Sequence, residues 1–400
     1  MSEWLRCMAC ARDYGIAENR VSCDCGGLLF VVRSALLVGR DVFDARRRNS
    51  RLPIDQSGVW RFREGVMTVD EATVVTHPEG ATRLYERDGV FFKHEGENPT
   101  GSFKDRGMTV AMTQAVRVGA RAVACASTGN TSASLAAYAA QAGLRAIVFL
   151  PAGKVSTGKL AQTLAYGALC VAVRGDFDAA MRLVLEASKR FGIYLVNSIN
   201  PFRIEGQKTI VWELLQDLEW RAPDWIVVPA GNLGNTSAFG KALQEARDAG
   251  WIDRMPRLAA IQARGANPFA RSFREAFVKR HRVDAETVAS AIRIGDPVSF
   301  DRAVAAIRAT NGVVEDVSDD EIMDAKRAID RMGIGCEPAS AATLAGLRKL
   351  RADGTIGARE RVVCVLTGNL MKDPDAARGD FIEIDADLDA VERAVIAPGP

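Results

Sequence analysis

Short β-branched runs alternate with helical segments along most of this chain, and this alternation limits the folds open to it. Residues 121–127, 145–152, 170–175 and 224–230 are typical of strands, and each run precedes a segment with helical periodicity. A further strand is expected at residues 361–368. Strands that are joined through helices are normally parallel and lie in sheets covered on both faces. The sequence therefore predicts an α/β fold with mostly parallel sheets.

The length of 400 residues suggests two packed lobes and a small additional module. We expect a Cys-rich, ribbon-like segment at residues 1–32, a larger discontinuous lobe at 33–104 and 201–385, a smaller lobe at 105–200, and a C-terminal tail at 386–400. In such folds ligands bind beyond the carboxyl ends of the strands, so the functional residues are expected there.

Composition and charge exclude several kinds of partner. A net charge of +2 provides no basic field for nucleic acid, and 48% apolar residues suit a sizeable buried core. No apolar run reaches the ~18 residues that a membrane span needs. The N-terminal sequence MSEWLRCMAC lacks the basic and apolar regions of a signal peptide. We therefore expect a cytoplasmic protein that binds neither nucleic acid nor membranes.

Four of the eight cysteines crowd into the first 25 residues. Cys7 and Cys10 form a C-x2-C pair, and Cys23 and Cys25 form a C-x-C pair. Two such pairs on turns can hold one tetrahedral zinc ion, although C-x-C is tighter than the usual spacing. The alternative is a ribbon that keeps its shape without metal, and the sequence leaves both possibilities open.

Gly-Asn pairs recur where predicted strands end. They lie in CASTGNTS (125–132), PAGNLGNTS (229–237) and LTGN (366–369), and the first two open predicted helices. Backbone N–H groups and the helix dipole favour an anion at such a position. Neither the P-loop pattern nor the dinucleotide pattern G-x-G-x-x-G is present. A single Gly-Asn turn is more often structural, but three at strand ends indicate an anion-binding edge.

Lys104 lies in a turn, just as a helical pattern begins. Ser102 and Asp105 have the spacing of a capping box, which predicts a helix from Phe103. Lys104 would then lie in the first turn, where the helix dipole disfavours an ammonium and lowers its pKa. An amine that is readily neutral suits imine formation with an aldehyde. The alternative is an ordinary surface lysine at a helix start.

Several segments together resemble the fold-type II pyridoxal-phosphate enzymes, and most closely the threonine synthase family. They are ENPTGSFKDRG, CASTGNTSAS, PAGNLGN and LTGNLMKDPD, with NSINPFRIEGQKT and GCEPASAA between them. The likeness runs from about residue 75 to residue 375, with the motifs in family order. It implies the two-lobed fold of that family, with pyridoxal phosphate bound in the larger lobe.

The resemblance also implies roles for cofactor-binding residues. Lys104 would carry the cofactor and later move protons between the α and β carbons of the substrate. Asn130 would hydrogen-bond the ring oxygen of the cofactor, and Thr367 would face its pyridine nitrogen. The cofactor phosphate would be held by the backbone N–H groups of Gly231, Asn232, Leu233, Gly234 and Asn235.

Further residues are implied for the substrate. The helix start after the first Gly-Asn loop would hold its carboxylate or phosphate through Ser127, Thr128 and Thr131. The substrate's own phosphate would be held by Asn197, Ser198 and Arg203. The guanidinium fork of Arg203 suits such an oxyanion, and its alternative role is a structural salt bridge.

The resemblance implies conversion of O-phospho-L-homoserine and water to L-threonine and phosphate by a homodimer. Two alternatives are a cysteate synthase-like β-replacement on an O-phospho amino acid and a catalytically silent paralogue that binds the cofactor. Leu233 and Leu370 stand where the family usually has smaller residues. Bulk at Leu370 is expected beside the pyridine ring, which bears on the identity of the substrate.

Overall fold

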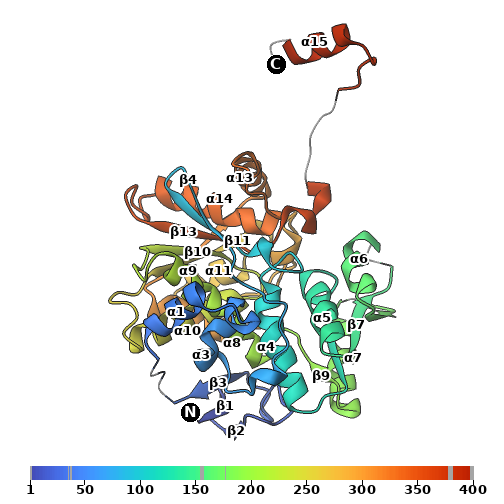
Figure 1. Cartoon of the computed structure of the whole chain (residues 1–400), viewed down its shortest axis with the longest axis vertical. Coiled ribbons are helices and arrows are strands. Elements are labelled where there is room, and N and C mark those ends of the chain that lie inside the picture. The colour runs from blue at the N-terminus through green and yellow to red at the C-terminus, as the bar shows by residue number, and fades with distance from the viewer. Residues whose placement is uncertain are drawn as a thin grey trace.

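The computed structural model describes residues 2–34, 36, 38–153, 157–175, 177–376 and 382–396. Its N-terminal part is an antiparallel ribbon of three strands, β1 (Glu3–Cys7), β2 (Asp13–Gly15) and β3 (Leu29–Arg33). β1 lies in the centre, where Leu5 pairs with Tyr14 of β2 and with Val31 of β3. The ribbon lies at the bottom of the molecule in Figure 1, beside the N-terminus.

The larger sheet has six strands in the order β12-β11-β10-β13-β5-β4. All neighbouring pairs are parallel except β4 with β5. Along β10, Ile226 and Val228 belong to one buried cluster, whereas Trp225 and Val227 belong to another. Because successive side chains point to opposite faces, this sheet is covered on both faces. The strands are β4 (Leu84–Arg87), β5 (Val90–His94), β10 (Trp225–Pro229), β11 (Arg257–Ala263), β12 (Val313–Val317) and β13 (Val362–Leu366).

Helices from distant parts of the chain cover the larger sheet. Residues of α9, α10 and α12 share the first buried cluster, and residues of α13 and α14 share the second. The first cluster also contains Leu5, Leu29 and Val31, so the apolar face of the ribbon is continuous with the main core. The helices of this part are α1 (Arg40–Asn49), α2 (Pro53–Gln56), α3 (Arg63–Val66), α8 (Pro201–Gln207), α9 (Thr209–Asp217), α10 (Gly234–Asp248), α11 (Pro268–Arg274), α12 (Phe300–Ala309), α13 (Asp319–Arg331) and α14 (Pro338–Ala352).

The smaller sheet is parallel throughout, with the order β8-β7-β6-β9. Val123 and Cys125 of β6 pack with residues of α4 and α5, while Ala124 and Ala126 pack with residues of α7. Figure 1 shows this layer on the right of the molecule. Its elements are α4 (Lys104–Arg117), β6 (Ala122–Ala126), α5 (Asn130–Gln141), β7 (Arg145–Pro151), α6 (Thr157–Ala165), β8 (Leu169–Val173), α7 (Phe177–Phe191) and β9 (Tyr194–Leu195).

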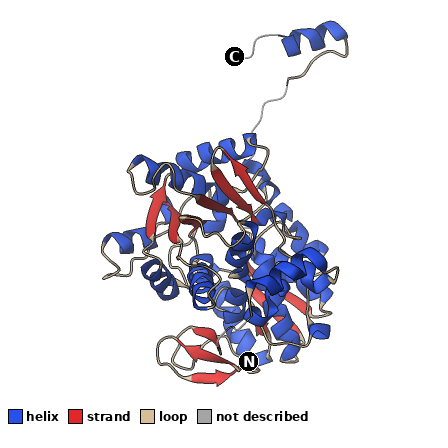
Figure 2. Cartoon of the chain, turned by 60° about the vertical axis from the view of Figure 1, so that its left-hand side comes forward, coloured by secondary structure: helices blue, strands red, loops and turns tan. Residues whose placement is uncertain are grey.

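The predicted fold class is confirmed, with a ribbon and two helix-covered sheets visible from both directions (Figure 2). Each of the five predicted runs contains a strand whose ends differ from the prediction by at most two residues, whereas β4, β5, β9, β11 and β12 have no counterpart among the predicted runs. The exact lobe boundaries stay a prediction. The last helix, α15 (Leu388–Ile396), lies away from the rest in both views. Within the described ranges, none of the helices combines the length and the apolar character that a membrane span requires.

Candidate active site

The ends of neighbouring parallel strands form the centre of the candidate site. β10, β13 and β5 lie side by side, and PAGNLGN and LTGN follow the first two of them. The segment before α4 is bonded to the same edge. The Phe103 N–H donates to the Thr367 carbonyl at 2.9 Å, and the Asn369 N–H donates to the Gly101 carbonyl at 2.9 Å. These bonds place Lys104, the first residue of α4, beside Thr367.

Lys104 is half-buried, and its ammonium lies 3.9 Å from the centroid of the Phe103 ring. Its pKa is lowered to about 7, first by burial and then by the positive charge of Arg203, while the Glu337 carboxylate opposes the shift. No ion pair joins Lys104 to a carboxylate of the described residues, and the effect of Glu337 is too small to restore the usual pKa. A lysine with these properties is a neutral nucleophile near neutral pH.

The predicted capping box is wrong, because tertiary partners take the side chain that would form it. The Asp105 carboxylate accepts from the Thr100 N–H at 2.7 Å, from the Thr100 hydroxyl at 2.6 Å and from the Ser134 hydroxyl at 2.5 Å. α4 begins at Lys104, one residue later than predicted, and has no side-chain cap. Asp105 instead ties the start of α4 to α5, which carries Asn130.

A buried ion network holds α4 in place behind Lys104. The Arg106 guanidinium donates to both oxygens of Glu95, at 2.6 and 2.7 Å, and to Glu213 at 2.6 Å. All three residues are almost fully buried. Removing one partner of such a network costs about 3–5 kcal/mol, because a buried charge is left without compensation. The network therefore fixes the helix that presents Lys104.

Glu337, at the start of α14, is a site residue that the sequence reasoning missed. Its carboxylate accepts from the Asn130 side-chain amide at 3.0 Å and from the Thr367 hydroxyl at 3.4 Å. Burial raises its pKa, opposed first by the bond from Asn130. Ser340, one turn further along, accepts from the Thr367 N–H at 2.8 Å and orients that residue. The available signal was the segment GCEPASAA, which contains Glu337 and matches the family.

The loop from Gly231 to Asn235 has the properties of an anion cradle. Its backbone N–H groups have no acceptor among the described residues, and α10 begins at Gly234. A Cβ on Gly231 would lie 2.9 Å from Ile292, so only glycine lets the chain pass there. The buried hydroxyls of Thr236 and Ser299 also lack hydrogen-bond partners. Unpaired donors around a glycine loop fit the phosphate of a bound cofactor.

Arg203 is 3% exposed and has no carboxylate partner among the described residues. Its guanidinium donates to the Val196 carbonyl at 3.2 Å, and its Nε has no partner. Burial lowers its pKa to about 10, so it remains charged at neutral pH. A buried cation without a counter-ion is costly unless an anion binds beside it. The structure thus offers no salt bridge that would account for Arg203.

The other residues predicted to bind substrate differ in whether their side chains are already hydrogen-bonded within the protein. Asn197 pairs with the backbone of Ala126, accepting from its N–H and donating to its carbonyl, both at 3.0 Å. Its amide therefore fixes the loop after β6 and is already engaged. Ser198 accepts from the side-chain amide of Asn232 at 2.8 Å, which links its loop to the anion cradle. Of the predicted residues that follow β6, Ser127 and Thr128 lie in the loop before α5 and Thr131 lies in the first turn of α5, and all three are half-buried.

The two departures from the family pattern have distinct surroundings. Leu233 adopts a left-handed conformation with φ of 63°, which is costly for leucine, but its side chain is buried in the main core. Leu370 packs against Gly335, where a Cβ would lie 2.7 Å from the leucine methyl carbon. A glycine with φ of 74° provides that space. The expected bulk beside the ring is therefore directed toward the loop before α14.

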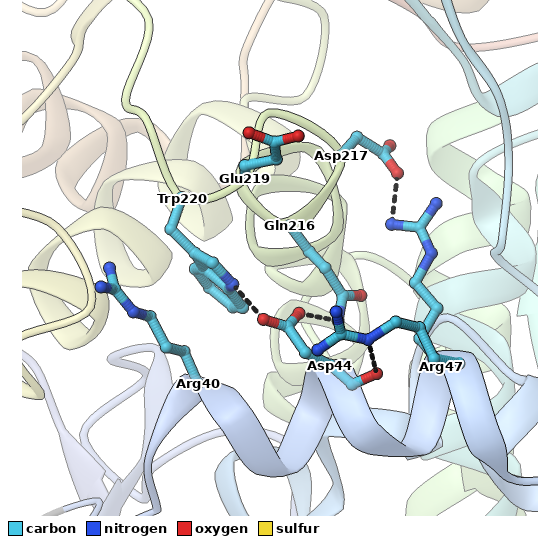
Figure 3. Close-up of a pocket in the computed structure, with 8 residues that line it drawn as sticks. Arg40, Asp44, Arg47, Gln216, Asp217, Glu219 and Trp220 are labelled. Atoms are coloured by element: carbon cyan, nitrogen blue, oxygen red, sulfur yellow. Dashed lines mark hydrogen bonds and ion pairs between the residues drawn. The ribbon is translucent and has the colours of Figure 1, made fainter.

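Two surface hollows of about 550 and 500 Å³ lie elsewhere on the molecule. The larger is lined by α1 and the end of α9 (Figure 3), and Lys104, Thr367 and Arg203 take no part in it. The acidic side chains of this hollow already accept hydrogen bonds. Arg47 pairs with Asp217 at 2.6 Å, and Asp44 accepts from the side chains of Gln216 and Trp220. Neither hollow is lined by residues of the strand-end loops that contain Gly231 and Thr367.

The four N-terminal cysteines converge, and their sulfur atoms all lie within 4.8 Å of one another. Three contacts are 3.5 to 3.6 Å, and Cys10 and Cys25 each take part in two of them. A tetrahedral zinc with Zn–S of about 2.3 Å requires sulfurs about 3.8 Å apart. Two disulfides would instead pair each sulfur once. A Cβ on Gly27 would lie 2.7 Å from the Cys7 sulfur, so the cluster depends on glycine there. The donor set fits one zinc ion.

The fold is that of an enzyme that uses pyridoxal phosphate. So are Lys104, which has no ion pair within the described residues, the anion cradle from Gly231 to Asn235, and the buried Arg203. Residues 70–368 match the model of the family described as pyridoxal-phosphate dependent enzyme. The chain is 45% identical to threonine synthase of Methanocaldococcus jannaschii, over 97% of this chain and 98% of the relative, and 44% identical to that of Methanosarcina acetivorans, over 98% of each. The Escherichia coli threonine synthase structure has the same fold, with a TM-score of 0.74 at 18% identity, covering 98% of this chain and 95% of that one. The chain belongs to the threonine synthase family of pyridoxal-phosphate-dependent enzymes.

Capture of pyridoxal phosphate by the cofactor-free enzyme should follow the ionisation of Lys104. With a pKa of about 7, the neutral amine predominates above neutrality and is lost as the pH falls. The rate of capture should therefore drop about tenfold between pH 8 and pH 6, whereas an ordinary lysine would titrate near pH 10.4. Stopped-flow absorbance measures this rate. A midpoint near pH 10 would show that the amine is not perturbed.

Proposed function

We propose that this chain is a threonine synthase, which converts O-phospho-L-homoserine and water to L-threonine and phosphate with pyridoxal phosphate as its cofactor. One observation carries the proposal. Lys104, a readily neutral lysine, lies close enough to Arg203 for the positive charge of this buried arginine, which has no carboxylate partner among the described residues, to lower the pKa of the lysine. This arrangement suits an enzyme that holds a carbonyl cofactor and a phosphorylated substrate together. The 45% identity to a threonine synthase over nearly the whole chain supports the same reaction.

The cofactor would be held by Lys104 and by the backbone N–H groups from Gly231 to Asn235. When bound, pyridoxal phosphate supplies an electron sink for negative charge at the α carbon of an amino acid. Thr367 would present a hydroxyl to the pyridine nitrogen, kept in place by Ser340. A hydroxyl leaves that nitrogen neutral, whereas a carboxylate would favour its protonation. Asn130, anchored by Glu337, would donate to or accept from the ring oxygen.

The substrate would be oriented by its phosphate and its carboxylate. Arg203 would hold the γ phosphate, with Ser198 beside it, and the residues of the loop after β6 would hold the carboxylate. The Lys104 amine would accept the proton from the α carbon and return protons to the carbons of the substrate as phosphate leaves and water adds at the β carbon. Phosphate retained by Arg203 would assist that addition. Glu337 lies close enough to influence the charge of Lys104.

Turnover of defined substrates tests the function. Purified holoenzyme should release threonine and phosphate in equal amounts from O-phosphohomoserine, as followed by chromatography and a phosphate assay. O-phosphoserine with sulfite tests the cysteate synthase-like alternative and should give no product. A protein that binds the cofactor but converts neither substrate would support the catalytically silent alternative.

The four-cysteine cluster is proposed to hold one structural zinc ion. Its four convergent sulfurs suit a structural role better than a catalytic one, because four protein ligands leave no open position. Elemental analysis of protein purified without added metal should find about one zinc per chain. A folded ribbon with no metal would favour the alternative of a metal-free module. Cofactor absorbance should be the same in both cases.

The homodimer and the cytoplasmic location stay predictions. The small phosphorylated substrate, which needs no membrane partner, is compatible with both. Light scattering of the purified protein measures the assembly, and a dimer would have twice the chain mass of 43.2 kDa. Fractionation of the producing cells addresses the location.

A further inference from the structure

We propose that the N-terminal ribbon positions the substrate-phosphate arginine, and that metal on its four cysteines maintains this position. The proposal rests on the proposed function for the identity of the phosphate ligand. Arg203 lies on α8, a helix of seven residues. A helix this short owes its position to packing with its neighbours, because its own propensity contributes little. The contacts of α8 therefore decide where Arg203 lies.

Buried charges join the ribbon to α8. At the end of β3, Arg33 donates to Glu205 of α8 at 2.5 Å, and the two side chains are 6% and 1% exposed. Glu205 also accepts from Lys208 at 2.6 Å and from Lys241. The Lys241 ammonium in turn donates to the Val31 carbonyl of β3 at 2.7 Å. Because a buried network is favourable only when its members keep their partners, β3 and α8 must stay in register.

Other positions of α8 pack tightly on α4 through two glycines. A Cβ on Gly107 would lie 3.0 Å from the Arg203 carbonyl oxygen, and one on Gly206 would overlap the Arg106 carbonyl. α8 is thus in contact both with the helix that begins at Lys104 and with the ribbon. Close packing transmits small displacements, so a shift of β3 would move α8 and with it the guanidinium.

The cysteine cluster lies on the loops that join the ribbon strands. β1 ends at Cys7, and β3 begins four residues after Cys25. The strands contain only five, three and five residues. So small a sheet needs additional support, and a tetrathiolate metal supplies it by closing the loops. Loss of the metal would loosen β3 and the Arg33 contact with α8.

The first test removes the two exposed cysteines of the cluster, Cys10 and Cys25. The Cys10→Ser/Cys25→Ser holoenzyme should contain no zinc, keep its cofactor absorbance, and bind inorganic phosphate on the order of tenfold more weakly than wild type. Phosphate is the product, so its Kd reports on the arginine without turnover. The KM for O-phosphohomoserine should rise in parallel, with a smaller change in kcat. Cys170→Ser, in β8, is the matched control and should change none of these values.

The second test separates the position of β3 from the metal. In Arg33→Met, Glu205 keeps its two lysine partners and all four cysteines remain, so zinc should stay bound while phosphate affinity falls. Arg33→Lys should recover part of that affinity. Wild-type phosphate affinity in Arg33→Met, or in a zinc-free cysteine variant, would overturn the coupling between the ribbon and Arg203. If the cysteine variant does not fold, the result for Arg33→Met alone decides between these outcomes. Wild-type protein that contains no zinc would overturn the part of the proposal that assigns a metal ion to the four cysteines. If the phosphate changes occur but no threonine forms, the proposed function fails and the coupling stands.

Discussion

Replacing Lys104 with alanine is expected to leave a folded protein that makes almost no threonine. The variant loses the amine that holds the cofactor and the group that carries protons between substrate carbons. Proton transfer by a positioned side chain alone contributes about 10²- to 10⁴-fold, so kcat should fall by at least that factor. The fold should survive, because Lys104 has no ion pair with the described residues and alanine favours a helix. Threonine release under saturating substrate measures the effect.

Chemical trapping provides an independent check on the same residue. Borohydride should fix the cofactor on Lys104 of the wild type, and mass spectrometry of the digested protein should find the adduct in that peptide. Lys189→Ala, which removes an exposed lysine of α7, should keep both activity and adduct. An adduct on another lysine, such as Lys154 or Lys159, would contradict the assignment.

The sequence was sufficient to predict five strands of the two helix-covered sheets and the edge at which they end. Apolar runs such as the one that became β10 are buried on both faces, so their pattern depends little on which elements lie beside them. Loops after parallel strands must then meet at one edge of the sheet. That rule is enough to predict that the Gly231–Asn235 loop and Thr367 lie at the same edge.

The pattern of partners around the site could not be predicted in the same way. Asp105 had the spacing of a cap, but three donors from Thr100 and Ser134 outcompete the helix end for its carboxylate. Glu337 lies in the segment GCEPASAA, whose spacing indicates no chemical role, and its burial beside Asn130 reveals its place in the site. Local spacing describes what a side chain can reach along the chain, whereas these contacts cross between elements that are far apart in sequence.

The ribbon shows the same limit on a larger scale. The sequence predicts the cysteine-bearing segment at residues 1–32 as a small module beside the two lobes. Instead, Leu5, Leu29 and Val31 are part of the main core, so deleting residues 1–30 would expose apolar surface of the large lobe. Point substitutions are therefore better tests of the ribbon than truncation.

Replacing Arg203 with alanine should separate recognition of the substrate from recognition of the cofactor. The cofactor phosphate is assigned to the Gly231–Asn235 loop, so Arg203→Ala should keep the absorbance of the bound cofactor. It should lose one charge-assisted contact to the substrate phosphate, which is worth roughly 1.5–3 kcal/mol. At ~1.4 kcal/mol per decade, kcat/KM should fall about 10- to 150-fold. If retained phosphate assists the addition of water, kcat should also fall, and more substrate should leave as 2-oxobutyrate.

Two further variants make the Arg203 result specific. Arg203→Lys restores a charge without the planar fork and should give kcat/KM between wild type and alanine, while Arg247→Ala removes an exposed arginine of α10 and should change nothing.

Because Arg203 has no carboxylate partner among the described residues, the alanine variant should also unfold at a Tm no lower than wild type when phosphate is absent. Loss of the cofactor from Arg203→Ala would refute the assignment, as would wild-type kcat/KM. A lower Tm would instead indicate that the guanidinium supports the fold. Activity lost on O-phosphoserine rather than on O-phosphohomoserine would indicate the β-replacement enzyme, since the same arginine would then serve the shorter substrate.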